Sequence, residues 1–340
     1  MGGPIFPSDV TIATTGLTRL LSYEPKDLTV SVEAGMPYAE LSRILAENRQ
    51  MVPLDPPFAD RATIGGVIST NSSGPRRRLY GTARDLVIGM TFATLEGKLV
   101  KTGGMVVKNV AGLDMGKLMI GSFGTLAAVA VVNFKVLPAP QVERLFLLSF
   151  DTLESAMAAR DKILKSVLQP SGIDLLNRLA AKILGWTGYV LAVQAGGNAA
   201  VVDRYEKELR EMGSLEIGDA KAASAIQQFT PRFLETHEKG AIVRISCTLA
   251  ALGEVVHSVN APVVARAASG VCYAYFEDTS AGAEMAGRTR DAIIDFAPET
   301  QKPTLNLWPT PGPDFELMKR VKQMFDPEYL LNRGRLYSQI

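Results

Sequence analysis

The sequence predicts an α+β protein of two domains followed by a C-terminal segment, and three observations support this prediction. The chain has 340 residues, of which 47% are apolar, so it is too long for one hydrophobic core and apolar enough for two. Residues 1–140 combine short β-type runs with many glycines, prolines and threonines. Residues 141–300 instead alternate strand and helix patterns, and residues 301–340 open on a run of prolines.

In the first domain, the spacing of apolar residues predicts the elements. Residues 29–33 alternate between apolar and polar, which is typical of a strand, and residues 127–136 form a second, buried strand. Apolar residues at helical spacing predict a short helix over residues 38–48. Glu96-Gly97 separates two β-type runs and therefore indicates a hairpin, with strands at 90–95 and 99–102.

The second domain repeats a strand and a helix four times. We expect strands at residues 145–150, 189–194, 242–248 and 271–276, and helices at 153–168, 201–212, 252–259 and 283–296. Strands alternating with helices of this length predict an antiparallel sheet covered by helices. A further helix over residues 315–325 precedes the terminal Asn332-Arg-Gly-Arg335.

Positive charge and glycine are concentrated in one stretch of the chain. The net charge of the whole chain is +1, which argues against a general nucleic-acid binder. Residues 60–124 nevertheless carry nine basic and four acidic side chains, together with 12 of the 30 glycines. Glycines let backbone N–H groups approach an anion closely, while basic side chains attract it. An anionic ligand is therefore expected at this stretch.

The chain has two cysteines and two histidines, which limits its metal chemistry. Iron–sulfur clusters and structural zinc sites need about four such ligands, so we expect no metal site in this chain. Cys247 and Cys272 fall in apolar strand patterns and are expected to be buried, unreactive thiols. His237 and His257 are expected at the surface or satisfied by hydrogen bonds, since no group that would orient a catalytic base is recognisable.

Neither a membrane span nor a secretory signal is recognisable. The longest uncharged run, between Lys117 and Lys135, contains several polar residues and falls short of the roughly 20 apolar residues that a spanning helix needs. The N-terminus lacks a basic region followed by an apolar core. We therefore expect a soluble, cytoplasmic protein without a transmembrane segment.

The segment from Thr63 to Gly74 has the clearest chemical pattern. Gly65-Gly66 removes two Cβ atoms at a chain reversal, so that a bulky group can lie flat against the main chain. Hydroxyl and amide side chains surround the pair, namely Thr63, Ser69, Thr70 and Asn71. If a helix starts near Gly65, its free N–H groups face a phosphate. A Gly/Ser-rich surface loop explains the same residues, and no Gly-x-Gly-x-x-Gly motif supports a Rossmann site.

Further motifs flank the glycine pair. They are Pro53-x-Asp55-Pro-Pro57, Gly74-Pro-Arg-Arg77, Gly81-x-x-Arg-Asp85, Lys108-Asn-Val-Ala-Gly-x-Asp114, Gly121-Ser-x-Gly124 and Asn332-x-Gly-Arg335. Together with Thr63-x-Gly-Gly66, they resemble the FAD-binding domain of the p-cresol methylhydroxylase/vanillyl-alcohol oxidase superfamily. Within that superfamily, the chain is most similar to the FAD-binding accessory subunits of bacterial glycolate oxidases. The combination is far more specific than a lone glycine pattern.

The resemblance implies the p-cresol methylhydroxylase-type fold, with FAD between an FAD-binding domain (1–140) and an α+β cap domain (141–300). The C-terminal segment, 301–340, would return to the flavin. Family members begin with a strand and a glycine-rich loop that grips the FAD pyrophosphate, and Met1-Gly2-Gly3-Pro4 resembles the far end of that loop, so we expect this loop to be truncated. The residues expected to contact FAD are Pro56, Thr63, Ile64, Gly65, Gly66, Ser69, Thr70, Asn71, Gly74, Tyr80, Gly121, Gly124, Val129 and Asn332.

Two of the candidate roles have an equal structural alternative. Tyr80 packs either on the flavin or in the core. Lys108 is the one weak candidate for a catalytic residue, because a cation near the flavin or near an anionic substrate stabilises negative charge there. A structural lysine explains Lys108 equally well.

The resemblance also implies a function. The chain would be the FAD-binding subunit of a complex that oxidises a small 2-hydroxy acid such as glycolate, and it would pass electrons to a partner or an external acceptor. The implied partners are a catalytic FAD subunit and an iron–sulfur subunit, through which the protein would reach the inner membrane peripherally. Relatives that oxidise 2-hydroxy acids carry a metal-binding histidine pair in the cap, which this chain lacks. Two alternatives stay open: an assembly subunit with a weak or empty FAD site, and a self-sufficient FAD-dependent oxidase of unknown substrate.

Overall fold

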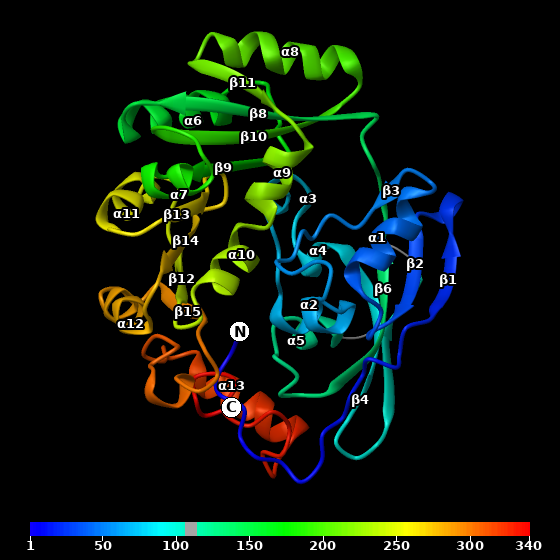
Figure 1. Cartoon of the computed structure of the whole chain (residues 1–340). Helices are drawn as coiled ribbons and strands as arrows, with labels where there is room; N and C mark the ends of the chain where they lie inside the picture. The colour runs from blue at the N-terminus through cyan, green and yellow to red at the C-terminus, as the bar shows by residue number, and fades with distance from the viewer. Residues whose placement is uncertain (106–113) are drawn as a thin grey trace. The chain divides into compact units, whose positions relative to one another are not determined.

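The computed structural model describes residues 1–105 and 114–340, and its chain forms two compact units (Figure 1). The first unit contains Met1–Ser73, Gly81–Ala139 and Thr310–Ile340. The second contains Gly74–Tyr80 and Pro140–Pro309. Each unit is therefore assembled from stretches that are distant in the sequence.

The described part of the first unit is built on a five-stranded antiparallel sheet. The strand order is β1-β2-β6-β4-β5, with β1 (Leu20–Glu24), β2 (Thr29–Glu33), β4 (Val87–Ala93), β5 (Leu99–Gly103) and β6 (Ala128–Lys135). A small second sheet pairs β3 (Gln50–Met51) with β7 (Leu137–Pro138). The helices are α1 (Tyr38–Ala46), α2 (Ile64–Thr70), α4 (Ala83–Leu86), α5 (Gly116–Met119) and α13 (Phe315–Phe325), and a 3-10 turn spans Pro25–Asp27.

One hydrophobic core joins this sheet to its helices. Alternate residues of a strand point to opposite faces, so Val32 on β2 and Phe134 on β6 are both fully buried against the helices. Leu41 on α1 and Ile68 on α2 belong to the same core. Phe325 of α13 also packs against it, which attaches the C-terminal helix to the unit that contains the N-terminal strands.

The second unit, all of whose residues the structure describes, holds an eight-stranded antiparallel sheet (Figure 1). The order is β11-β8-β10-β9-β13-β14-β12-β15, with β8 (Val142–Phe150), β9 (Gly172–Leu176), β10 (Tyr189–Gly197), β11 (Ser214–Gly218), β12 (Ala241–Ser246), β13 (Val263–Arg266), β14 (Val271–Phe276) and β15 (Ala292–Phe296). The helices are α3 (Arg77–Tyr80), α6 (Leu153–Lys165), α7 (Arg178–Ile183), α8 (Ala199–Arg210), α9 (Ala220–Gln227), α10 (Phe229–Thr236), α11 (Leu252–Ser258) and α12 (Thr279–Gly287), and a 3-10 turn spans Lys302–Thr304.

Helices cover both faces of the eight-stranded sheet. Residues of α6, α8, α11 and α12 share one buried cluster with one set of strand residues, including Val243. Residues of α7, α9 and α10 share a second cluster with the alternate set, including Ile242. The predicted antiparallel sheet covered by helices is therefore confirmed for this unit.

The structure corrects one predicted helix, over residues 283–296. Helix α12 ends at Gly287, and Ala292–Phe296 forms strand β15, which pairs with β12 at the sheet edge. Ile293 and Ile294 are β-branched and suit a strand, and pairing with β12 buries Ile294. The short apolar run fits both the helical and the strand period, so only its pairing with β12 determines that it forms a strand.

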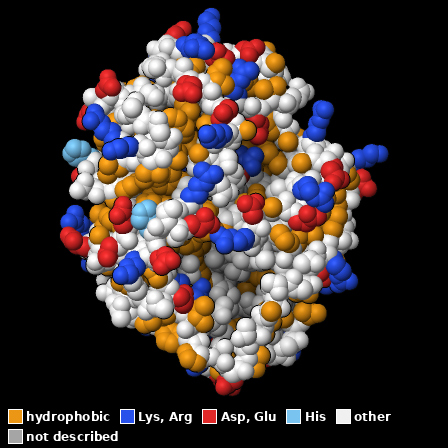
Figure 2. Space-filling model, viewed as in Figure 1, with side chains coloured by type: hydrophobic (Ala, Val, Ile, Leu, Met, Phe, Trp, Pro, Cys, Tyr) orange, Lys and Arg blue, Asp and Glu red, His pale blue; other side chains and the backbone are white. Residues whose placement is uncertain are grey.

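The surface of the molecule mixes both signs of charge. Figure 2 shows Lys and Arg side chains interspersed with Asp and Glu over the face drawn, in keeping with the near-zero net charge. Among the helices within residues 1–105 and 114–340, none is long and apolar enough to cross a membrane.

Candidate cofactor site

Helix α2 places the glycine pair at its first turn, where every N–H group of that turn is already bonded. Ile64 N–H donates to Met36 O at 2.9 Å, and Gly65 N–H donates to Ala34 O at 2.6 Å. Gly66 N–H donates to Oγ1 of the N-cap residue Thr63 at 3.2 Å. The prediction that free N–H groups near Gly65 face a phosphate is therefore wrong, because the unit itself takes up these donors.

The two glycines of the pair have different structural roles. A Cβ atom added to Gly65 would lie 3.0 Å from Ala34 Cβ and 3.1 Å from its carbonyl oxygen, so Gly65 allows α2 to pack closely on Ala34. Gly66 is exposed. Among the described residues, a Cβ atom there would closely approach only Thr63 Oγ1, at 3.2 Å. The backbone of Gly66 is therefore a bare, accessible surface.

The end of α2 is joined to the loop that contains Gly121 and Gly124. Gly121 N–H donates to Ile68 O at 3.1 Å, and Phe123 N–H donates to Ser69 O at 2.8 Å. Gly121 has a φ of 80°, a conformation that glycine adopts readily. The structure thus brings together two glycine-bearing segments, residues 63–74 and residues 121–125, that are about 50 residues apart in the sequence.

Side-chain hydroxyl groups form hydrogen bonds within each of the two segments. Thr70 Oγ1 donates to Gly66 O at 2.8 Å and lies 2.8 Å from Ser72 Oγ. In the second segment, Ser122 Oγ donates to Met119 O at 2.9 Å, and Thr125 Oγ1 donates to Ser122 O at 2.7 Å. Ser69 is half-buried and Asn71, in the left-handed conformation that ends α2, is exposed.

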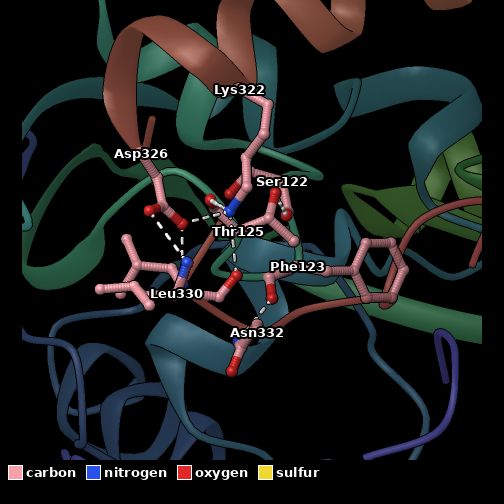
Figure 3. Close-up of polar contacts among 8 residues, drawn as sticks. Ser122, Phe123, Thr125, Lys322, Asp326, Leu330 and Asn332 are labelled. Atoms are coloured by element: carbon pink, nitrogen blue, oxygen red, sulfur yellow. Dashed lines mark hydrogen bonds and ion pairs between the residues drawn. The ribbon is translucent and has the colours of Figure 1, made fainter. Parts of the chain in front are cut away.

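A buried ion pair ties the C-terminal helix to the second glycine-bearing segment (Figure 3). Lys322 and Asp326 have fully buried side chains, with Nζ 2.5 Å from Oδ2. Lys322 Nζ also donates to Thr125 O at 2.7 Å and to Leu331 O at 3.1 Å. One ammonium group therefore joins α13, the loop before β6 and the chain end.

The same pair shapes the turn that follows α13. Asp326 accepts the backbone N–H groups of Leu330 and Leu331 at 3.0 and 2.7 Å. Burial alone would raise the pKa of Asp326, but hydrogen bonds from Lys322 and from the two N–H groups hold it below its usual value. Burial lowers the pKa of Lys322, and Asp326 offsets this only in part. The turn is therefore organised around a carboxylate.

The turn places Asn332 against the second glycine-bearing segment. Asn332 Nδ2 donates to Phe123 O at 2.8 Å (Figure 3). A Cβ atom on Gly124, whose φ is 69°, would lie 2.7 Å from Asn332 Nδ2, so a larger residue at 124 would displace the asparagine. The expected return of the Asn332 loop to the glycine-bearing segments is observed, and its contact with a cofactor stays a prediction.

The N-terminal residues join this cluster through Arg335. Gly3 N–H donates to Arg335 O at 2.8 Å, and the Arg335 guanidinium donates to Gly3 O at 2.8 Å and to Met1 O at 2.7 Å. Ser72 Oγ lies 3.6 Å from Met1 Sδ. Four separate stretches of chain thus meet in the first unit.

The other residues that were expected to contact FAD lie outside the contacts described above. Ile64 and Val129 are buried in the core of the first unit, and Pro56 is buried in the loop before α2. Gly74 and Tyr80 belong to the second unit, where Gly74 is buried and Tyr80 is half-buried at the end of α3. The weak catalytic candidate Lys108 lies outside the described residues.

Sequence reasoning missed Lys322, Asp326 and the role of Arg335. Lys322 and Asp326 are four residues apart on a helix, which is the spacing of an ordinary exposed ion pair. Only the motif Asn332-x-Gly-Arg335, directly downstream, pointed to this part of the chain. Their burial depends on contacts with Thr125, which is remote in the sequence.

Comparison with protein families finds two matching stretches in this chain. Residues 2–103 match the family model of the FAD binding domain, and residues 310–336 match that of the C-terminal domain of FAD linked oxidases. The two matched stretches are thus similar to an FAD binding domain and to the C-terminal domain of FAD linked oxidases. The expected cofactor, FAD, and the expected resemblance are confirmed.

Two curated relatives are similar to this chain over about half of its length. The chain is 34% identical over 198 residues to glycolate oxidase subunit GlcE of Escherichia coli K12, a match that covers 56% of this chain and 55% of that protein. It is 30% identical over 162 residues to glycolate oxidase subunit GlcD of Bacillus subtilis, covering 48% of this chain and 34% of that protein. The matched region thus spans about half the length of the first relative and a third of the second.

Solved structures share the fold of this chain. An alkyldihydroxyacetonephosphate synthase superposes with a TM-score of 0.69 at 17% identity, covering 93% of this chain and 65% of the other. The 4-ethylphenol oxidase of Gulosibacter chungangensis superposes with a TM-score of 0.67 at 13% identity, covering 94% and 78%. The predicted α+β fold of the p-cresol methylhydroxylase type is confirmed.

The described residues fit a flavin dinucleotide. The exposed backbone of Gly66 can accept a flat group, because a Cβ atom is what would otherwise occupy that surface. Thr63 and Asn71, whose side chains carry a hydroxyl and an amide, lie at the two ends of the same helix. The particular residues that contact FAD remain predictions.

Proposed function

We propose that the chain is the FAD-binding subunit of a complex that oxidises a small 2-hydroxy acid, with glycolate as the substrate. The similarity to GlcE and GlcD, which are named as glycolate oxidase subunits, supports this proposal. The observation that carries it is the bare Gly66 backbone beside the bonded segments of residues 63–74 and 121–125. A dinucleotide cofactor needs such an accessible stretch of main chain.

The chain's own residues would hold the cofactor rather than perform its chemistry. Bound FAD supplies the capacity to accept two electrons from a hydroxy acid and to pass them on. Gly66 would offer the flat surface, and Gly121 would keep the facing segment in its left-handed conformation. Asn332 and Lys322 would fix the loop of residues 121–125 in place through Phe123 O and Thr125 O.

The proposal includes partners. The two relatives are named as subunits, which supports a multi-subunit complex. We place a catalytic FAD subunit and an iron–sulfur subunit beside this chain in the cytoplasm, with contact to the inner membrane through them. In this arrangement the chain passes electrons from FAD to a partner or to an external acceptor.

The absorbance spectrum of the purified chain tests the proposal. We expect a flavin spectrum that glycolate leaves unchanged when the chain is alone and bleaches when the partner subunits are added. Bleaching by glycolate without partners would instead indicate a self-sufficient oxidase. A colourless chain that takes up no added FAD would indicate an assembly subunit and would contradict the proposal.

A further inference from the structure

Three neighbouring strands of the eight-stranded sheet carry charged side chains beside an apolar cluster. Strands β13, β14 and β12 are adjacent in the sheet of the second unit (Figure 1). On one face of this sheet, Tyr275 of β14 packs against Phe233 of α10, with ring centroids 5.2 Å apart, and its hydroxyl lies 2.8 Å from Thr230 Oγ1. Tyr273 lies on the same face, because alternate residues of a strand share one face. Tyr273 therefore stands at the border of the apolar cluster, which it contacts.

Arg244 stands directly beside Tyr273 on this face. The two residues are paired across β12 and β14, and both are half-buried. Arg244 Nε donates to Asp295 Oδ2 at 3.1 Å, which fixes the direction of the guanidinium. Among residues 1–105 and 114–340, the terminal nitrogens of Arg244 and the hydroxyl of Tyr273 have no hydrogen-bond partner. Adjacent donors on one face are thus available to an acceptor from outside the chain.

A second arginine holds the ring of Tyr273 from the opposite strand. Arg266 on β13 is a diagonal neighbour of Tyr273, and its guanidinium carbon lies 5.5 Å from the centre of the ring. A cation in this position is attracted by the face of the ring. Arg266 Nη1 in turn donates to Oδ2 of the buried Asp174 at 2.5 Å. The position of the Tyr273 hydroxyl is therefore fixed before any ligand binds.

The charges of this surface leave one positive charge unbalanced. Its charged groups are three guanidinium groups and two carboxylates, those of Arg77, Arg244, Arg266, Asp174 and Asp295. Burial is the main cause that raises the pKa of Tyr273, and Asp295 adds to it, against the opposite effect of the three arginines. The hydroxyl therefore stays protonated at neutral pH and can donate a hydrogen bond.

We propose that Arg244 and Tyr273 form a binding site for the carboxylate group of a small monoanionic ligand. The two terminal nitrogens of a guanidinium match the two oxygens of a carboxylate, and the Tyr273 hydroxyl adds a third donor to the same group. One carboxylate neutralises the excess charge of the surface, whereas a dianion would exceed it. The site lies wholly in the second unit and is independent of the proposed function, which concerns the first unit.

Thermal unfolding of the full chain, followed by tryptophan fluorescence, tests the proposal. Both tryptophans, Trp186 and Trp308, lie in the second unit, and a ligand that binds the folded unit raises its unfolding temperature. Sodium acetate is the probe, because it has a carboxylate but no hydroxyl group that FAD could oxidise. We expect acetate to raise the unfolding temperature above that in sodium chloride of equal ionic strength, and the rise to saturate with acetate concentration.

Substitutions at the two donors distinguish this site from general effects of salt. Arg244→Lys keeps the charge but removes the planar pair of nitrogens, and Tyr273→Phe keeps the ring but removes the hydroxyl. Each should weaken acetate binding, measured by isothermal titration calorimetry, by about tenfold or more. Arg144→Lys is the matched control. Arg144 on β8 of the same sheet is also half-buried, lies near an aromatic ring and pairs with Glu206 at 3.0 Å, and its substitution should leave acetate binding unchanged.

The phenylalanine variant keeps the test decisive even if Arg244→Lys fails to fold. Tyr273→Phe should unfold at the wild-type temperature without acetate, since the hydroxyl that it loses bonds to no residue that the structure describes. The proposal is overturned if Tyr273→Phe and a folded Arg244→Lys bind acetate as tightly as the wild type does. It is equally overturned if acetate and chloride shift the wild-type unfolding temperature by the same amount.

Discussion

Lys322 and Asp326 illustrate how a buried ion pair can organise a chain end. Removing two charges from water is costly, and their mutual attraction compensates only when further hydrogen bonds satisfy both groups. Here Thr125 O and Leu331 O serve the ammonium, while two backbone N–H groups serve the carboxylate. The pair therefore fixes the position of the turn after α13 more than it stabilises the fold. Removing either member should destabilise the protein, because the other would stay buried without its counter-charge.

Asp326→Asn should lower the free energy of unfolding by about 3–5 kcal/mol, because Lys322 would remain buried without its counter-charge. Denaturant unfolding followed by circular dichroism measures this. Tryptophan fluorescence is unsuitable for the first unit, because both tryptophans, Trp186 and Trp308, lie in the second unit. Glu316→Gln, in the exposed pair with Lys319 on the same helix, is the matched control and should cost less than about 1 kcal/mol. Equal effects of the two substitutions would contradict a buried, structural pair.

Gly66→Val and Gly65→Ala should have opposite consequences. Valine at 66 would stand on the accessible backbone surface and should reduce the flavin content of the purified protein by about tenfold or more, a loss of about 1.4 kcal/mol in binding. The melting temperature without flavin should change little, since the side chain meets mainly Thr63 Oγ1. Alanine at 65 would press on Ala34 and should lower that temperature. Full flavin content in Gly66→Val would exclude this surface as the cofactor site.

At the scale of elements, the chain end acts as a strap across the second glycine-bearing segment. Residues 326–332 leave α13, turn around Asp326 and reach Phe123 O through Asn332. Neither α13 nor the loop of residues 121–125 would hold this geometry alone, because their contacts are mutual. The strap is therefore a tertiary element made of irregular backbone.

Asn332→Ala should loosen this strap. The loss of one hydrogen bond to Phe123 O corresponds to about 1 kcal/mol. Amide hydrogen exchange should accelerate over residues 326–336 and 121–125 together, while β8 and β10 of the second unit should be unaffected. Ser338→Ala, at an exposed position of the same chain end, serves as the control. Faster exchange confined to residues 332–336 would argue against a strap that couples the two segments.

Regular elements were predictable from the sequence where one local pattern decided them. The hairpin at Glu96-Gly97 and the helix over 315–325 are confirmed because turn chemistry and helical spacing act within a few residues. Strand β15 was missed because only pairing with β12 distinguishes it from a helix. In the site, the glycines were recognisable from their motifs, whereas the burial of Lys322 depends on Thr125 and could not be predicted locally.

At the scale of the whole molecule, acid should destabilise the first unit. Asp326 has a folded-state pKa below its ordinary value of 3.8, so its ionised form stabilises the folded unit above that pH. The contribution disappears as the pH falls through the folded-state pKa. Glu33 follows the same sign, because hydrogen bonds from Arg19 lower its pKa below 4.5.

A pH series between 5 and about 2 should therefore show a fall in the stability of the first unit that begins near the ordinary pKa values of 4.5 for Glu33 and 3.8 for Asp326. Circular dichroism of the wild type and of Asp326→Asn measures it. The variant, which has no titrating group at this position, should start less stable and show a flatter decline over that range. Parallel pH profiles for the two proteins would mean that Asp326 does not carry this dependence.

The composition of the first unit from Met1–Ser73, Gly81–Ala139 and Thr310–Ile340 has a consequence for biosynthesis. Translation delivers every residue of the second unit before α13 has been made, so that unit can fold while the ribosome is still working. The first unit is completed only after Lys322 and Asn332, which follow the second unit in the sequence, have been made. A stop codon between Pro309 and Lys322 would therefore disturb the unit expected to bind the cofactor while leaving the second unit in its native conformation.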